Sequence, residues 1–242
     1  MNRTNRESKQ TAVKLFLLSV LSAVMLWVQP AGAQGNPVRI MPLGDSITSS
    51  IDGQASYRYW LWNRLQAAGF NVAFVGTLWG VGDGASGINP NFDQSHEGHP
   101  GATTQDILDG INGWAAQDQP DVVLLLIGVN DFQEGVTPGR ALLNTRQIIN
   151  ALRAENPQVV ILWAMLPPVV GEMPQERAYN MGLVSFAMRL STPQSPIRVV
   201  NLWPGYLPAR DTVDGQHPNA SGEKKIANRF FAGLVPILAR FR

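Results

Sequence analysis

Three side chains in this sequence have the types that an activated serine nucleophile requires. The apolar run 38–43 leads directly into Gly44-Asp45-Ser46, and Asp214 and His217 lie three residues apart near the other end of the chain. A serine hydroxyl becomes a good nucleophile when a neighbouring imidazole takes its proton and a carboxylate holds that imidazole. The D-x-x-H spacing lets one turn bring Asp214 to Nδ1 of His217, which leaves Nε2 for Ser46. These residues indicate an enzyme with an activated serine.

The elements that must position these side chains alternate between apolar runs and amphipathic runs, which is typical of a parallel sheet covered by helices. The run at 122–127 is apolar at every position, as in strands that are buried on both faces. We therefore expect a three-layer α/β/α fold with a five-stranded parallel sheet. The five expected strands are 38–43, 72–75, 122–127, 159–165 and 197–202.

Helical spacing of apolar residues, together with capping residues, predicts the helices between these strands. The expected segments are 57–68, 107–115, 138–156, a stretch within 176–190, and 219–238. The connection 77–101 is long and rich in Gly, Asp and Asn, and connections of that length are usually functional or disordered. Because parallel strands end at one edge of the sheet, we expect this connection, the Ser46 turn, 128–131 and 214–217 to meet there.

The first 33 residues have the three parts of an export signal, so we set them apart from the catalytic domain. Basic residues precede an apolar run at 15–28, and Ala31-Gly32-Ala33 offers an A-x-A cleavage site. The run is shorter than the roughly 20 residues of a membrane-spanning helix, which favours a removed signal over a retained anchor. We expect 34–242 to form one exported domain, periplasmic or extracellular, that is monomeric and has no membrane span once the signal is removed.

Charge and composition exclude several classes of protein. Beyond the signal, 15 basic and 17 acidic side chains remain, so no basic surface is available for nucleic acid. The chain has no cysteine, which excludes disulfides, thiolate metal sites and cysteine nucleophiles. The segments 82–87 and 96–99 resemble dinucleotide and zinc motifs, but Pro90, Gly98 and Pro100 oppose the helices that such motifs need. We expect neither a cofactor nor a metal.

Four segments, taken in order, resemble the sequence blocks of the SGNH, or GDSL, hydrolase superfamily. They are Gly44-Asp45-Ser46-Ile47-Thr48, Gly101, Gly128-Val129-Asn130-Asp131 and the pair Asp214 and His217. The resemblance spans nearly the whole chain after the signal and implies a flavodoxin-like fold. It implies Ser46 as nucleophile, with Asp214 and His217 completing a triad. It also implies an oxyanion hole built from the backbone amides of Ser46 and Gly101 and the side-chain amide of Asn130, a set of donors suited to developing negative charge.

Other residues of these blocks are interpreted as structural. Asp45 and Asp131 are short acids at turns, where such side chains commonly accept hydrogen bonds from nearby backbone, so we leave both out of the triad. Trp79, in the long connection, is interpreted as a hydrophobic anchor, with stacking on a sugar ring as the alternative.

Further motifs are similar to the acetylxylan-esterase-like branch of these enzymes: 40–48, Tyr57-Arg58, 74–76 and 96–101. This similarity implies hydrolysis of O-acetyl esters of carbohydrate. Two positions depart from that branch, since Ala102 replaces an aromatic residue and Ser50 replaces a glycine. The alternatives are a lysophospholipase- or thioesterase-like acyl hydrolase, an acetyl transferase, and a non-catalytic glycan-binding protein on the same scaffold.

Overall fold

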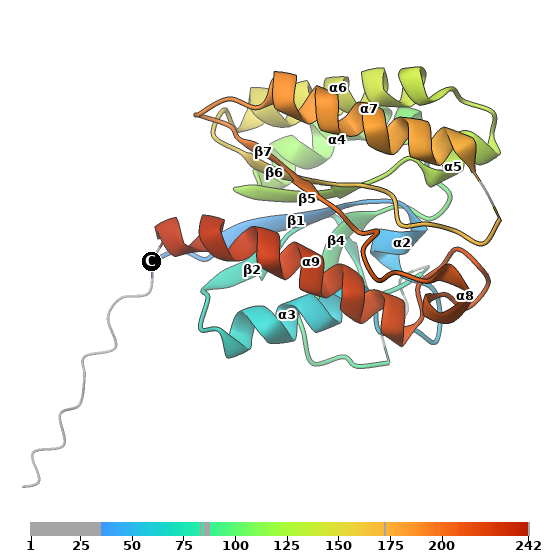
Figure 1. Cartoon of the computed structure of the whole chain (residues 1–242). Coiled ribbons are helices and arrows are strands. Elements are labelled where there is room, and N and C mark those ends of the chain that lie inside the picture. The colour runs from blue at the N-terminus through green and yellow to red at the C-terminus, as the bar shows by residue number, and fades with distance from the viewer. Residues whose placement is uncertain (1–34, 83, 85–87, 172, 242) are drawn as a thin grey trace, which may run out of the picture. The chain divides into compact units, whose positions relative to one another are not determined.

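The computed structural model of the chain describes residues 35–82, 84, 88–171 and 173–241 (Figure 1). The expected export signal at 1–33 lies outside the described residues. Within them, the elements follow in the order β1 (Val38–Gly44), α2 (Ser46–Ser49), α3 (Tyr57–Ala67), β2 (Val72–Phe74), β3 (Leu78–Trp79), β4 (Ser95–Gly98), α4 (Thr104–Asp118), β5 (Val122–Leu126), α5 (Val129–Gln133), α6 (Pro138–Glu155), β6 (Val160–Ala164), α7 (Pro174–Leu190), β7 (Ile197–Val200), α8 (Pro208–Asp211), α9 (Ala220–Leu238) and η1 (Ala239–Phe241).

The described strands form one sheet of seven, with the order β3-β4-β1-β5-β6-β7 and with β2 paired to β1. β1 is central, because it pairs with β5 on one side and with both β2 and β4 on the other. The five expected strands are present as β1, β2, β5, β6 and β7, and every pairing among them is parallel. The three-layer α/β fold is therefore confirmed.

The expected strand count of five is wrong, because β3 and β4 form within the connection 77–101. β4 runs parallel to the end of β1, and β3 pairs with β4 in the antiparallel direction. β3 has two residues, and β4 is a Ser-His-Glu-Gly segment without a single aliphatic side chain. Neither strand carries the apolar pattern by which strands are recognised in a sequence.

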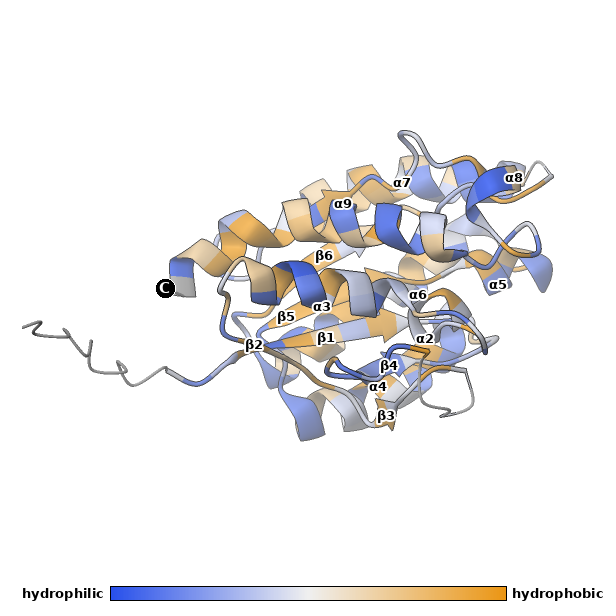
Figure 2. Ribbon diagram, turned by 90° about the horizontal axis from the view of Figure 1, so that it is seen from below, coloured by the Kyte–Doolittle hydropathy of each residue, from blue (hydrophilic) through white to orange (hydrophobic). Residues whose placement is uncertain are grey.

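Helices cover both faces of the sheet. α3 and α9 lie on one face, and α4, α6 and α7 lie on the other (Figure 1). Apolar residues concentrate on the strands, and the helices are mixed, with hydrophilic and hydrophobic residues (Figure 2). All residues of β5 are fully buried, as its uninterrupted apolar run predicts. Tyr57 of α3 stacks on Phe230 of α9, with ring centroids 5.4 Å apart, which joins the two helices of one layer.

The helices begin at the residues whose types favour helix N-termini. Thr137 caps α6 through a hydrogen bond from the Arg140 backbone N–H, and Asn219 caps α9 through bonds from the two N–H groups that follow Ala220. Thr103 and Asp106 form a reciprocal capping box at the start of α4. None of the helices in the described part of the chain has the length and hydropathy needed to cross a membrane.

Candidate active site

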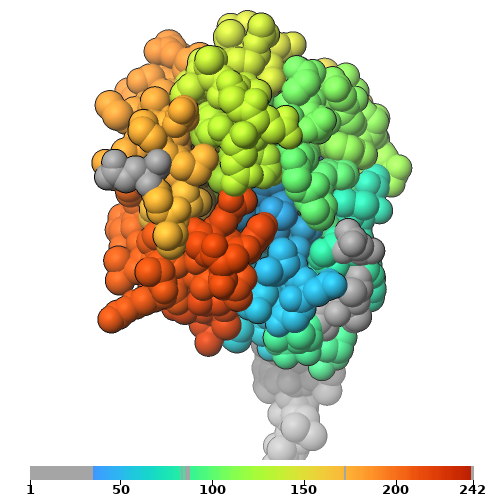
Figure 3. Space-filling view, turned by 90° about the vertical axis from the view of Figure 1, so that its right-hand side faces the viewer, coloured from blue at the N-terminus to red at the C-terminus, as the bar shows by residue number. Residues whose placement is uncertain are grey.

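The site lies at the point where the strand order of the sheet reverses. The chain adds β2 on one side of β1 and then crosses to β5 on the other side, and ligands of open parallel sheets bind beyond the strand ends at such a point. Figure 3 shows this edge: the segment that follows β1 (blue) lies between segments from near residue 100 (green) and from 205–222 (red-orange). Residues distant in the sequence therefore meet at one rim.

The turn after β1 holds Ser46 at the rim. Asp45 is the N-cap of the four-residue helix α2, because its Oδ1 accepts a hydrogen bond from the Ile47 backbone N–H at 2.9 Å. Ser46 is the first residue of that helix. Gly44 allows this turn to pack closely on β5, since a Cβ on Gly44 would lie 2.0 Å from the Leu126 carbonyl oxygen. The turn is therefore fixed on both sides before any substrate binds.

Ser46, His217 and Asp214 form one hydrogen-bonded chain. Nε2 of His217 lies 3.0 Å from the Ser46 hydroxyl oxygen, and Nδ1 of His217 lies 2.6 Å from Oδ2 of Asp214. Ser46 is almost fully buried, whereas the side chain of Asp214 is half exposed. The arrangement allows the imidazole to take a proton from the hydroxyl while the carboxylate stabilises the resulting imidazolium.

The loop that carries Asp214 and His217 is tied internally. Oδ1 of Asp214 accepts hydrogen bonds from the backbone N–H groups of Gln216 and His217, at 3.0 and 2.8 Å. The hydroxyl of Thr212 accepts from the Gly215 backbone N–H at 2.9 Å. Partial burial works to raise the pKa of Asp214, but the hydrogen bonds from His217 and Gln216 outweigh it and hold that pKa at about 2. Asp214 is therefore ionised at any pH at which the protein is expected to work.

Two further predicted site residues, Gly101 and Asn130, lie at the same rim. Nδ2 of Asn130 donates a hydrogen bond to the Ala102 carbonyl at 2.8 Å, which uses one of its two N–H bonds and joins the two segments. Gly101 has a φ of +77°, a conformation that side chains with a Cβ rarely adopt, and the space beside its Cα is open. The backbone at Gly101 and the amide of Asn130 are thus available to a small polar group.

Asp45 and Asp131 lie beneath this rim and accept hydrogen bonds from backbone, as we interpreted them. Both carboxylate oxygens of Asp131 accept from Thr104, one from the backbone N–H at 2.8 Å and one from the hydroxyl. Asp45 is fully buried, and its Oδ2 has no hydrogen-bond partner among the described residues. Burial raises the pKa of Asp45 to about 7.

Sequence reasoning gave no role to Arg58, which links the Ser46 turn to the long connection. Its guanidinium is fully buried and donates to the Thr48 and Ser49 carbonyls at 2.9 Å each. It also donates to the Gly80 and Gln94 carbonyls at 2.5 and 2.7 Å. Burial lowers the pKa of Arg58 to about 10, so the group remains charged at neutral pH. The Tyr57-Arg58 motif is part of the family resemblance found in the sequence, but that resemblance assigned no role to the arginine.

The motif at 96–99 is part of the structure of the long connection. Nδ1 of His96 accepts a hydrogen bond from the Gly98 backbone N–H at 2.9 Å, and burial keeps the pKa of His96 far below its usual value, at about 2. Nε2 of His99 pairs with Oε2 of Glu97 at 2.8 Å, and its ring stacks on Trp114 at 4.2 Å. Among the described residues no group of three or more His, Cys, Asp or Glu side chains could hold a metal ion.

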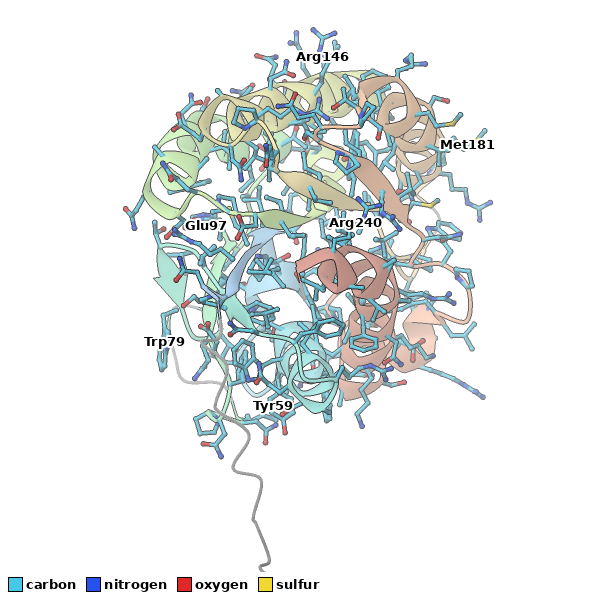
Figure 4. All side chains as sticks on the ribbon, turned by 90° about the vertical axis from the view of Figure 1, so that its left-hand side faces the viewer. Tyr59, Trp79, Glu97, Arg146, Met181 and Arg240 are labelled. Atoms are coloured by element: carbon cyan, nitrogen blue, oxygen red, sulfur yellow. The ribbon has the colours of Figure 1, made fainter. Side chains whose placement is uncertain are left out.

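The interpretation of Trp79 as a hydrophobic anchor is wrong. Its side chain lies at the outer edge of the sheet on β3 (Figure 4), and 54% of it is exposed. Backbone pairing between β3 and β4 holds this part of the connection in place, so its position does not depend on burial of the Trp79 side chain.

A flavodoxin-like parallel sheet that brings a serine, a histidine and an aspartate to its carboxyl edge is the architecture of an SGNH-type ester hydrolase. Residues 43–225 match the profile of the GDSL-like lipase/acylhydrolase family, and the chain belongs to that family. It is similar to a multidomain esterase of Ruminococcus flavefaciens, with 26% identity over 93% of this chain, but it spans only 32% of that relative.

Two solved structures are also similar. An acetyl esterase with a bound acetate ion has 27% identity and a TM-score of 0.77, over 85% of this chain and 100% of that one. A carbohydrate esterase of family 3 from Talaromyces cellulolyticus has 28% identity and a TM-score of 0.77, over 84% of this chain and 99% of that one. The expectation of an ester hydrolase that resembles carbohydrate esterases is confirmed.

Proposed function

We propose that this protein is an exported serine esterase that removes O-acetyl groups from carbohydrate, with Ser46, His217 and Asp214 as its triad. The observation that carries the proposal is the continuous hydrogen-bonded contact from the Ser46 hydroxyl through the His217 ring to Asp214, at 3.0 and 2.6 Å. A polar loop that only covers the surface would not require an imidazole between a buried hydroxyl and an ionised carboxylate.

The reaction proceeds in two halves. Nε2 of His217 takes the proton of Ser46 as its Oγ attacks the acetyl carbon, and the tetrahedral intermediate expels the sugar alkoxide, which receives that proton. Water then attacks the acetyl-serine and loses a proton to His217. As the second intermediate collapses, His217 returns this proton to Oγ of Ser46, and acetic acid leaves and ionises to acetate. Asp214 remains an anion throughout, because its pKa of about 2 lies far below the pH of the reaction.

The negative charge of each tetrahedral intermediate falls on the former carbonyl oxygen. The backbone N–H groups of Ser46 and Gly101 and the free N–H of the Asn130 amide are the donors assigned to it. The bond from Asn130 to the Ala102 carbonyl holds the amide in a fixed orientation before substrate arrives. Donors that need no rearrangement in the transition state provide a large share of the catalysis in such enzymes.

Three lines of support favour acetylated carbohydrate as the substrate. The two similar solved structures are an acetyl esterase and a carbohydrate esterase, and both align along nearly their whole length. The motifs at 40–48 and 96–101 resemble the acetylxylan-esterase-like branch. Export through the leader at 1–33 fits a polymeric substrate outside the cell, and sequencing the N-terminus of the protein secreted by its host tests cleavage after Ala33.

A profile of acyl chain length tests the substrate class. The purified protein is assayed on 4-nitrophenyl acetate, butyrate, octanoate and palmitate, and released acetate is measured with acetylated xylan. The proposal predicts the highest kcat/KM for the acetyl ester and a release of acetate from the polymer. A maximum at octanoate or palmitate, without release of acetate from xylan, would instead establish a lysophospholipase- or thioesterase-like hydrolase.

A further inference from the structure

A cavity of about 380 Å³ lies beside the loop that carries Asp214 and His217. It is formed by the connection after β6, the start of α7 and the segment that leads into α8. Its lining includes Val170, Met173, Glu176, Trp203, Leu207 and Ala209. In Figure 3 the segment near residue 170 (orange) borders the segment 205–215 (red-orange) at this place.

The wall of the cavity is in direct contact with the triad loop. The backbone N–H of Val170 donates to the Gly215 carbonyl at 2.7 Å. A Cβ on Gly215 would lie only 3.0 Å from the Cβ of Val170, so the two segments meet without a gap between them. Gly215 lies between Asp214 and His217 in the sequence, so the cavity adjoins the loop that carries these two residues.

The chemistry of the proposed reaction places the alcohol half of the ester on this side. The proton that His217 holds must pass to the leaving alkoxide, so the sugar oxygen lies next to Nε2 of His217. The carbonyl oxygen lies on the opposite side, towards Gly101 and Asn130. Units of a carbohydrate chain beyond the acetylated one therefore extend across the loop 214–217, towards the cavity.

The lining combines apolar walls with one buried carboxyl group and with Arg177, whose guanidinium lies 5.7 Å from the centre of the Trp203 ring. Val170, Met173 and Leu207 provide aliphatic surface, and Trp203 provides a partly exposed ring. Glu176 is 3% exposed, and among the described residues its Oε1 has no hydrogen-bond partner. Burial raises the pKa of Glu176 to about 8, so the carboxyl is largely protonated at neutral pH and can both donate and accept.

A sugar ring fits this combination better than a hydrocarbon chain does. Its C–H faces pack against aliphatic and indole surfaces, and its hydroxyls can hydrogen-bond the carboxyl group of Glu176, which lines the cavity. An acyl chain offers this carboxyl group no hydrogen bond. Resting on the proposed function, we propose that this cavity binds a glycosyl residue of the substrate chain, adjacent to the sugar that carries the acetyl group.

The test compares substrates that differ only in the length of the sugar chain. Wild type and variants are assayed on acetylated xylose and acetylated xylotetraose, and also on 4-nitrophenyl acetate and 4-nitrophenyl octanoate, which carry no sugar. Ala209→Trp fills the mouth of the cavity from an exposed position on α8, and Ala116→Trp at an exposed position on α4 is its matched control. Glu176→Leu removes the polar group while it keeps an apolar side chain of similar size.

The proposal predicts that the wild type prefers acetylated xylotetraose to acetylated xylose. Ala209→Trp and Glu176→Leu each lower kcat/KM on xylotetraose by roughly five- to tenfold through KM, a loss typical of one stacking or hydrogen-bonding contact. Their activity on 4-nitrophenyl acetate stays at the wild-type value, which shows that they fold. Ala116→Trp behaves as wild type on all four substrates.

Other results distinguish a failure of the cavity assignment from a failure of the proposed function. Equal kcat/KM on both sugars, or variants that lose both equally, would overturn the cavity assignment and leave the proposed esterase intact. No activity on any acetylated sugar, with activity on 4-nitrophenyl acetate, would overturn the proposed substrate class and the cavity assignment with it. A loss by Ala209→Trp on 4-nitrophenyl octanoate alone would assign the cavity to an acyl chain instead.

Discussion

The ring of His217 lies 3.0 Å from the hydroxyl of Ser46, although 171 positions separate them in the sequence. Ser46 depends on the first strand of the sheet, and His217 depends on the loop before the last long helix. Their contact forms only when the whole domain is folded, because β1 is central and α9 closes one layer. Asp214, three residues from His217, needs only its own loop to reach the ring.

Asp214→Asn is expected to lower kcat by about 10²- to 10⁴-fold with little change in KM. The amide no longer stabilises the imidazolium and allows the ring to bind in the wrong tautomer. Because the Asp214 side chain is half exposed, water compensates in part, and the loss should be smaller than that of His217→Ala. Steady-state kinetics on 4-nitrophenyl acetate measure both, with the exposed Val213→Ala as control in the same loop. An Asp214→Asn variant with wild-type kcat would remove Asp214 from the triad.

Asn130→Ala is expected to lower kcat by about 10²- to 10³-fold and to leave KM nearly unchanged, because the lost donor serves the transition state. Asn130→Asp separates this role from packing, since aspartate has the same size but offers no N–H. Both variants should lose activity on 4-nitrophenyl acetate, and Asp should lose at least as much as Ala. Full activity of Asn130→Asp would show that the side chain only fills space.

Arg58→Met is expected to lower the free energy of unfolding by about 3–5 kcal/mol, because it leaves several buried carbonyl groups without donors. Urea titration followed by circular dichroism measures the change. Arg64→Met on the same helix is the control. Arg64 is exposed, donates to Asn228 and lies over the Phe231 ring at 4.5 Å, so its loss should stay within about 1 kcal/mol. Equal losses in the two variants would contradict the role given to Arg58.

Asp45 predicts a specific dependence of stability on pH. Burial raises its pKa from 3.8, the ordinary value of an aspartate, to about 7, so folding takes up a proton between about pH 4 and pH 7. Through this group the free energy of unfolding falls as the pH rises across that window. Asp45→Asn should make the slope less negative than in wild type, as measured by urea titrations at pH 4.5, 6 and 7.5. The exposed Asp109→Asn is the control, and an unchanged slope in Asp45→Asn would exclude this proton uptake.

Much of the fold could be predicted from the sequence, because the central strands carry continuous apolar runs and the helices begin with capping residues. The residues 122–127 can hardly be anything but a buried strand, and Thr137-Pro138 marks a helix start by local chemistry alone. β3 and β4 could not be predicted in this way. Their stability comes from pairing with β1 and with each other, and the polar side chains of β4 find partners only in the folded domain.

The candidate site likewise has residues that the sequence predicted and residues that it did not. Residue type and spacing single out Ser46, Asp214 and His217, whereas Gly101 and Asn130 come from the resemblance to the SGNH hydrolases. Arg58 and Glu176 did not stand out, since the role of each depends on burial among segments from several parts of the chain. Arginine and glutamate are most often exposed, and a sequence alone gives no reason to expect otherwise.

The measurement that tests the central claim most directly is the release of acetate from acetylated xylotetraose by wild type and by Ser46→Ala. The account predicts that Ser46→Ala loses about 10⁴-fold or more in kcat, while its urea unfolding midpoint stays close to that of wild type. Release of acetate by folded Ser46→Ala at the wild-type rate would contradict the account.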